Sequence, residues 1–80
     1  MVEKYAIDKY LDCKGLNCPI PIVNIGRALK ELSVGQMLEV EANDPAFKAD
    51  VTAFVRQLKH EILSIEEIGK ITKVVIRKER

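Results

Sequence analysis

The chain has 80 residues, and its 13 Lys and Arg against 12 Asp and Glu give a formal net charge of +1. This balance creates no global field that would attract the protein to nucleic acid or to anionic lipid, and two tyrosines and two phenylalanines offer little surface for stacking bases. A chain of this length predicts one domain, residues 1–80, with a modest margin of stability.

Membrane and secretory segments are not expected from the sequence. Hydrophobic residues make up 48% of the chain and charged residues 31%, which is typical of a globular domain in water. No apolar run approaches the roughly 20 residues that span a bilayer. The first eight residues carry Glu3 and Asp8 and lack the apolar core of a secretory signal. We therefore expect a cytoplasmic protein.

The first half of the chain reads as a strand, a turn and a helix. Apolar residues at period two predict a strand over 4–12, and a polar turn follows over 12–17, where Gly15 is expected to take a positive φ. A helix is predicted from Pro19 to about Leu32, ending before Gly35. Its apolar stripe has the spacing Ile22, Ile25, Leu29 and Leu32.

The second half predicts one helix and three strands. Alternating residues over 37–42 indicate a strand with one buried side, and Asn43-Asp44-Pro45 then resembles a helix start with Asp44 as its cap. The helix is expected to end near Lys59, with His60 as an exposed junction residue. Strands are predicted around 63–66 and over 72–76, joined by a tight turn at 69–70.

This element order is β-α-β-α-β-β, an α/β chain of the α+β two-layer sandwich type. A strand–helix–strand unit implies a right-handed crossover, so the first two strands are expected to be parallel. The tight turn at 69–70 makes the last two strands antiparallel. The sequence therefore predicts a mixed four-stranded sheet with two helices on one face, which buries both apolar helix stripes.

The strongest chemical signal is Cys18-Pro19-Ile20-Pro21 at the start of the first predicted helix. Prolines are tolerated in a first helical turn, where the N–H groups have no partner within the helix. Cys18 is therefore expected at the N-cap, where the positive end of the helix lowers the pKa of a thiol. With two prolines lacking N–H groups, the amides of Ile20 and Ile22 are the expected donors to the sulfur.

The residues Leu11-Asp12-x-x-Gly15-x-x-Cys18-Pro19-x-Pro21 resemble the signature of the TusA/SirA-like sulfur-carrier family. The likeness continues through Asn43-Asp44-Pro45 and Asp50 and covers essentially the whole chain. The resemblance implies that Cys18 accepts sulfane sulfur as a persulfide and passes it to a partner protein. It does not select among tRNA thiolation, molybdenum-cofactor assembly and sulfur oxidation.

The resemblance also implies a set of partners and a limited chemistry. The expected partners are a sulfur donor, such as a cysteine desulfurase or a rhodanese-like protein, and a sulfur-acceptor protein. We expect a sulfurtransferase-type carrier without small-molecule turnover of its own, with no cofactor and no membrane or direct nucleic-acid partner. The mixed surface charge indicates a monomer. Asp12, Gly15, Pro19 and Pro21 are expected to shape the site, and Lys14 to be a solvated surface residue.

Several alternatives stay open at this point. Cys13 is favoured as a structural residue at a strand end, although it could resolve a persulfide or form a disulfide with Cys18. Two cysteines and one histidine are too few soft ligands for a structural zinc site, so no metal is expected. The competing functions are a non-catalytic regulatory or interaction module, in which the thiol is incidental, and, less favoured, an RNA-binding domain.

Overall fold

The computed structural model describes residues 5–17 and 19–80. Its elements along the chain are β1 (Lys9–Asp12), α1 (Ile20–Glu31), β2 (Met37–Ala42), α2 (Phe47–Gln57), β3 (Glu61–Ile68) and β4 (Ile71–Arg77). This is the predicted order β-α-β-α-β-β. The four strands form one sheet in the order β1-β2-β4-β3.

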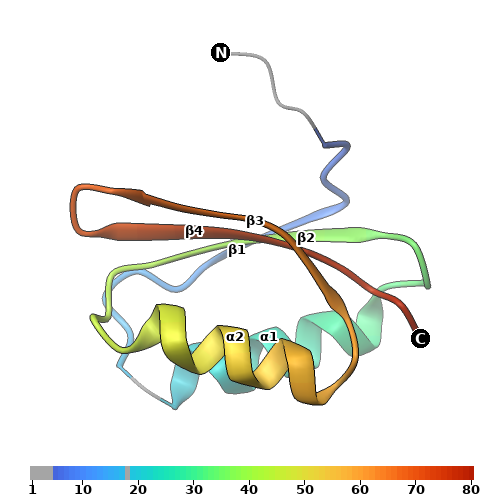
Figure 1. The fold of residues 1–80 in the computed structure, drawn as a ribbon, viewed down its shortest axis with the longest axis horizontal. Helices are drawn as coiled ribbons and strands as arrows, with labels where there is room; N and C mark the ends of the chain where they lie inside the picture. Colours follow the sequence, from blue (N-terminus) through green and yellow to red (C-terminus); the bar gives the residue numbers. More distant parts are fainter. Residues whose placement is uncertain (1–4, 18) are drawn as a thin grey trace.

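The sheet is mixed, as predicted. β1 and β2 are parallel, whereas β4 is antiparallel both to β2 and to β3. Both helices lie against the same face of this sheet and run in the same direction, so their N-terminal ends lie at one end of the molecule (Figure 1). The chain's C-terminus lies near the opposite end, beside the helix C-terminal ends (Figure 1).

The core fills the layer between the helices and the sheet. Val40 and Val74 are paired neighbours in the sheet and are fully buried. From the helices, Ile25 and Phe47 enter the same layer with at most 1% of their surface exposed. The strand residues that face the helices alternate with residues on the open face, which is the period-two pattern of a half-buried sheet.

The first strand is shorter than predicted. Residues 5–8 are not in the sheet, so the strand expected over 4–12 begins only at Lys9. The Tyr5 hydroxyl donates instead to the Leu63 carbonyl, 3.3 Å away on β3. Leu63 lies at a β-bulge, where one strand has an extra residue and a backbone group is left unpaired. The alternation of Tyr5 and Ile7 was therefore a misleading signal.

The ends of α2 also differ from the prediction. The N-cap position is occupied by Ala46 rather than Asp44. The Asp44 carboxylate accepts a hydrogen bond from the Ala46 amide at 3.1 Å, and its carbonyl accepts from the Phe47 amide at 3.0 Å. Asp44 therefore closes the turn that leads into the helix. At the other end, Lys59 reverses the chain with a φ of 63°.

His60 is half-buried rather than exposed. Its Nδ1 accepts a hydrogen bond from the Glu79 amide at 3.0 Å, which ties the C-terminal segment to the end of α2. Burial lowers the pKa of His60, and the nearby positive charge of Lys78 acts in the same direction. Both effects favour the neutral imidazole that this hydrogen bond requires.

The open face of the sheet carries ion pairs. Lys73 lies 3.5 Å from the Glu39 carboxylate on the neighbouring strand. Glu39 is only 9% exposed, so this face is less open at its centre than the sequence indicates. Among residues 5–17 and 19–80, no helix has the length and hydropathy needed to cross a membrane.

Candidate functional site

The helix α1 begins one residue later than predicted. Pro19 occupies the N-cap position with φ −97° and ψ 14°, and Pro21 lies in the first turn, where it is buried. The prediction that Cys18 itself is the N-cap is therefore wrong by one position. Cys18 lies outside the described residues. Its neighbour Pro19 is exposed, so the chain reaches the surface where it enters α1.

The amides at this helix end are fewer than expected. The Ile20 amide donates to the Asn17 carbonyl at 2.9 Å, so the prediction that it is available to a ligand is wrong. The other predicted donor, the Ile22 amide, has its place in the helix ladder opposite Cys18, which lies outside the described residues, so its availability stays a prediction. Among the described residues no side chain forms a capping hydrogen bond at this end, and the first turn of α1 contains no acidic residue. The positive end of the α1 dipole is therefore not offset by a carboxylate within that turn.

The turn that leads to Cys18 is built on Asp12 and Gly15. The Asp12 carboxylate accepts a hydrogen bond from the Lys14 amide at 3.0 Å. This bond, together with the Lys14 ammonium, lowers the pKa of Asp12. Gly15 has a φ of 85°, which confirms the predicted positive φ and explains glycine here, since an L side chain would be strained.

Residues distant in sequence attach this turn to β2. The Gly15 amide donates to the Asn43 side-chain oxygen at 2.9 Å. The Cys13 amide donates to the Glu41 carbonyl at 2.7 Å, as a continuation of the pairing between β1 and β2. Asn43 was considered only as part of a helix start in the sequence. Its contact with Gly15 depends on strand register, which local patterns do not give.

A charged cluster on the open sheet face supports the same turn. Lys14 is exposed, as predicted, and its ammonium also forms ion pairs, 3.2 Å from Asp12 and 3.0 Å from Glu41. Glu41 also accepts a hydrogen bond from the Tyr10 hydroxyl at 2.6 Å. That bond and the Lys14 ammonium lower the pKa of Glu41, while the pKa values of Tyr10 and Lys14 are raised.

Cys13 is a core residue. Its side chain is 0% exposed and belongs to the cluster between sheet and helices, and it is a free thiol. Burial raises the pKa of the Cys13 thiol, although a hydrogen bond with Asn24 acts in the opposite direction. The structural role predicted for Cys13 agrees with this environment, since a buried, protonated thiol is a poor nucleophile.

We expect iodoacetamide to leave Cys13 of the native protein unmodified under conditions that modify Cys18. Its reaction should be slower by about two orders of magnitude, because alkylation requires local opening and a thiolate that burial disfavours. Mass spectrometry of digested protein after timed alkylation from pH 6 to pH 10 measures both rates. Equal rates for the two cysteines in native protein would contradict this assignment.

The remaining residues that the sequence singled out lie elsewhere. Asp50 is in the first turn of α2, and Asp44 precedes that helix, so both lie at the same end of the molecule as the start of α1 (Figure 1). His60 lies beyond the opposite end of α2 and is separate from this site. Within residues 5–17 and 19–80, no group of three or more His, Cys, Asp and Glu side chains is arranged to hold a metal ion.

These features define a small α+β sandwich in which an anchored turn precedes Pro19 at the N-cap of α1. The chain belongs to the TusA family: the family model described as Sulfurtransferase TusA matches residues 9–78. This assignment confirms the resemblance found in the sequence.

Relatives of similar length support the family assignment. YrkI of Bacillus subtilis (strain 168) is 46% identical over 71 residues, which cover 89% of this chain and 95% of that protein. The sulfur carrier protein TusA of Allochromatium vinosum is 39% identical over 71 residues, covering 89% of this chain and 93% of the relative.

The fold is also similar to a solved structure. The crystal structure of a SirA-like protein from Desulfitobacterium hafniense superposes with a TM-score of 0.78 at 20% identity, covering 90% of this chain and 99% of that one. At this identity the similarity concerns the fold alone.

Proposed function

We propose that this protein is a sulfur carrier in which Cys18 accepts sulfane sulfur as a persulfide and transfers it to a partner protein. The observation that carries the proposal is the position of Cys18, one residue before the Pro19 N-cap of a helix whose first turn contains no acidic residue. Membership of the TusA family and a relative named as a sulfur carrier protein support the same role.

The proposed chemistry is a thiol exchange. The Cys18 thiolate attacks the outer sulfur of a donor persulfide R–S–SH, so that a new S–S bond forms on Cys18 while the donor's S–S bond breaks. The donor leaves as the thiolate R–S⁻, and Cys18 holds –S–SH. In the second step an acceptor thiolate attacks the outer sulfur of Cys18, and Cys18 leaves as a thiolate. Neither step requires an external oxidant or reductant, because the sulfane sulfur passes from one thiolate to the other.

The residues around Cys18 have supporting roles in this proposal. The positive end of α1 favours the thiolate before loading and the persulfide anion after it. Pro19 and Pro21 fix the backbone beside the sulfur. Asp12 and Gly15 shape the preceding turn, which Asn43 connects to β2. Each of these groups positions the sulfur, and the proposal assigns none of them as a base.

The proposal extends to partners, location and oligomeric state. A cysteine desulfurase or rhodanese-like protein would donate sulfur, and a second protein would receive it. The pathway served would be tRNA thiolation, molybdenum-cofactor assembly or sulfur oxidation. The carrier would act as a cytoplasmic monomer of one domain, with no cofactor and no turnover of a small molecule of its own.

Incubation with a cysteine desulfurase and cysteine, followed by intact-mass measurement, tests the proposal. We expect an adduct of one sulfur atom on the protein, which dithiothreitol removes. Without the desulfurase no adduct should form. If no sulfur adduct forms with either a desulfurase or a rhodanese-like donor, the thiol is incidental. The protein would then be better described as an interaction module.

A further inference from the structure

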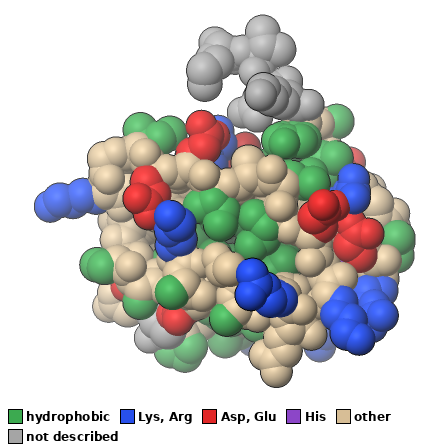
Figure 2. Space-filling model, in the orientation of Figure 1, with side chains coloured by type: hydrophobic (Ala, Val, Ile, Leu, Met, Phe, Trp, Pro, Cys, Tyr) green, Lys and Arg blue, Asp and Glu red, His purple; other side chains and the backbone are tan. Residues whose placement is uncertain are grey.

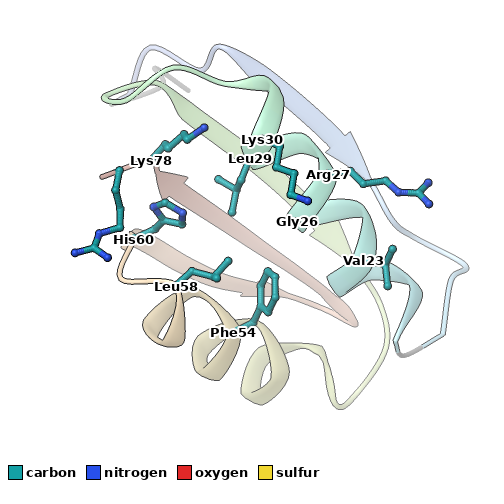
Figure 3. Close-up of a pocket in the computed structure, with 10 residues that line it drawn as sticks. Val23, Gly26, Arg27, Leu29, Lys30, Phe54, Leu58, His60 and Lys78 are labelled. Atoms are coloured by element: carbon teal, nitrogen blue, oxygen red, sulfur yellow. The ribbon is translucent and has the colours of Figure 1, made fainter.

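A groove of about 510 Å³ runs between α1 and α2, and its lining shares no residue with the charged cluster at Glu41 (Figure 3). Val23 and Leu29 line it from α1, while Phe54 lines it from α2 and Leu58 from the C-cap position of that helix. At one end the groove is bordered by His60 and by the C-terminal segment. It is thus a surface feature separate from the turn that precedes Cys18.

The groove has an apolar floor that remains accessible. Val23 is 48% exposed and Leu58 39% exposed, and the Phe54 ring is directed toward α1 (Figure 3). Gly26 lies opposite the Phe54 ring, where an added Cβ would make ordinary van der Waals contact with the ring tip at 3.4 Å. Exposed apolar side chains gathered in one groove are typical of a surface that binds a partner.

The charges around the groove have one sign. Its lining includes four cationic residues and no aspartate or glutamate. The cationic residues are Arg27, Lys30, Lys78 and Arg80. By contrast, Figure 2 shows basic and acidic side chains interspersed over another face of the molecule. In a chain with a net charge of only +1, this grouping is a local excess.

These cations have no carboxylate partner within the described ranges. The ion pairs there involve other basic residues, which are Lys9, Lys14, Lys48, Lys73 and Arg77. Lys78 donates to the Leu32 carbonyl at 2.7 Å, and Lys30 lies in the last turn of α1. Both therefore complement the negative end of the α1 dipole, which is equivalent to only about half a charge. Most of the positive charge remains available.

We propose that this groove binds an acidic amphipathic helix of a partner protein, mainly at the end where the C-termini of α1 and α2 lie. Apolar side chains of that helix would pack on Phe54 and Leu58, and its carboxylates would face Lys30, Lys78 and Arg80. The groove follows α1 from Val23 to Lys30, roughly 10 Å at the rise of a helix, which suits about two turns of a partner helix. Identifying this partner as a member of the sulfur relay rests on the proposed function.

The test uses a designed peptide as the probe. The peptide has 14 residues, enough for about four helical turns when bound, with Leu at positions i, i+4, i+7 and i+11 and Glu elsewhere. Titration of the full chain, followed by backbone amide shifts and calorimetry, should give a Kd in the micromolar range, with shifts centred on residues 23–30 and 54–60. A peptide with Gln in place of Glu should bind at least about tenfold more weakly.

Charge reversal localises the binding. The Lys30→Glu/Arg80→Glu variant should bind the Glu peptide at least about tenfold more weakly. The matched control is Arg56→Glu/Lys70→Glu, because Arg56 lies in the last turn of α2 as Lys30 does in that of α1, and the net charge change is the same. The control should retain the affinity of the unaltered chain within about twofold.

Three results would overturn the proposal. The first is no detectable binding of the Glu peptide at millimolar concentration. The second is an equal loss of affinity in both double variants. The third is a set of amide shifts at the groove that decanoate, added as a small amphipathic anion, causes and the peptide does not. The last would assign the groove to small amphipathic anions. Sulfur loading of Cys18 is measured separately, so normal loading without peptide binding rejects this proposal alone, and peptide binding without loading rejects only the carrier role.

Discussion

Replacing Cys18 by serine should abolish sulfur loading completely, so that incubation with a sulfur donor leaves the mass of the variant unchanged. A serine hydroxyl is a far weaker nucleophile toward sulfane sulfur than a thiolate, and it cannot form the S–S bond that holds the transferred atom. Intact-mass spectra recorded over a time course, with circular dichroism to confirm that the variant is folded, measure this effect.

The matched control is Cys13→Ala, which removes the other cysteine. Because Cys13 is 0% exposed and burial raises its pKa, this variant should still load one sulfur atom on Cys18. Its rate should match that of the unaltered protein within about twofold, since the thiol it lacks takes no part in exchange. Loading of Cys18→Ser, or a Cys13→Ala variant that no longer loads, would contradict the assignment of Cys18 as the sole acceptor.

Replacing Phe47 by alanine should lower the free energy of unfolding by about 3 to 5 kcal/mol, the range found for fully buried phenylalanines. Phe47 is the largest fully buried side chain, with 1% exposed, and it joins the first turn of α2 to the sheet. The total stability of a domain of 80 residues is on the order of 4 to 12 kcal/mol. The variant should therefore lose about a quarter or more of its stability, which urea unfolding would show as a clearly lower midpoint.

Phe54→Ala provides the comparison on the same helix. Phe54 is only partly buried and lies in the groove between the helices, so its truncation should cost about 1 to 2 kcal/mol, in proportion to the apolar area it buries. A loss at Phe54 equal to or greater than that at Phe47 would mean that the core is centred on the groove and not beneath the sheet.

Periodicity predicted most of the fold because burial depends on it. The apolar spacing Ile22, Ile25 and Leu29 placed α1, and alternation over 37–42 placed β2, since both elements bury one side only. The parallel pairing of β1 and β2 followed from the handedness of their crossover. Residues 5–8 have the same alternation but do not form a strand. The neighbouring strand β2 begins at Met37, which bonds with Asp8, so β2 offers no backbone partner to the residues before Asp8.

The candidate site was only partly predictable. The Cys-Pro-x-Pro segment and Gly15 are local signals, and the positive φ of Gly15 is confirmed. Asn43 and Glu41 could not be identified in the same way, because they reach the turn only through the register of β1 on β2. The engagement of the Ile20 amide by Asn17 was also missed, since it depends on the path of the turn.

The groove could not be predicted from the sequence, because its residues come from segments that are distant along the chain. Lys30 belongs to a solvent-facing helix position, whereas Lys78 and Arg80 belong to a polar tail, and nothing local connects them. They meet because α1, the end of α2 and the segment after β4 converge at one end of the molecule (Figures 1 and 3).

The most direct test of the carrier role follows a labelled sulfur atom through the protein. The chain is loaded by a cysteine desulfurase with isotope-labelled cysteine, freed of the donor, and treated with cyanide, which removes sulfane sulfur as thiocyanate and restores the thiol. We predict one labelled sulfur per chain, located by peptide mapping on Cys18, and its full recovery as labelled thiocyanate. Label on Cys13, or label that cyanide does not release, would contradict transfer through a Cys18 persulfide.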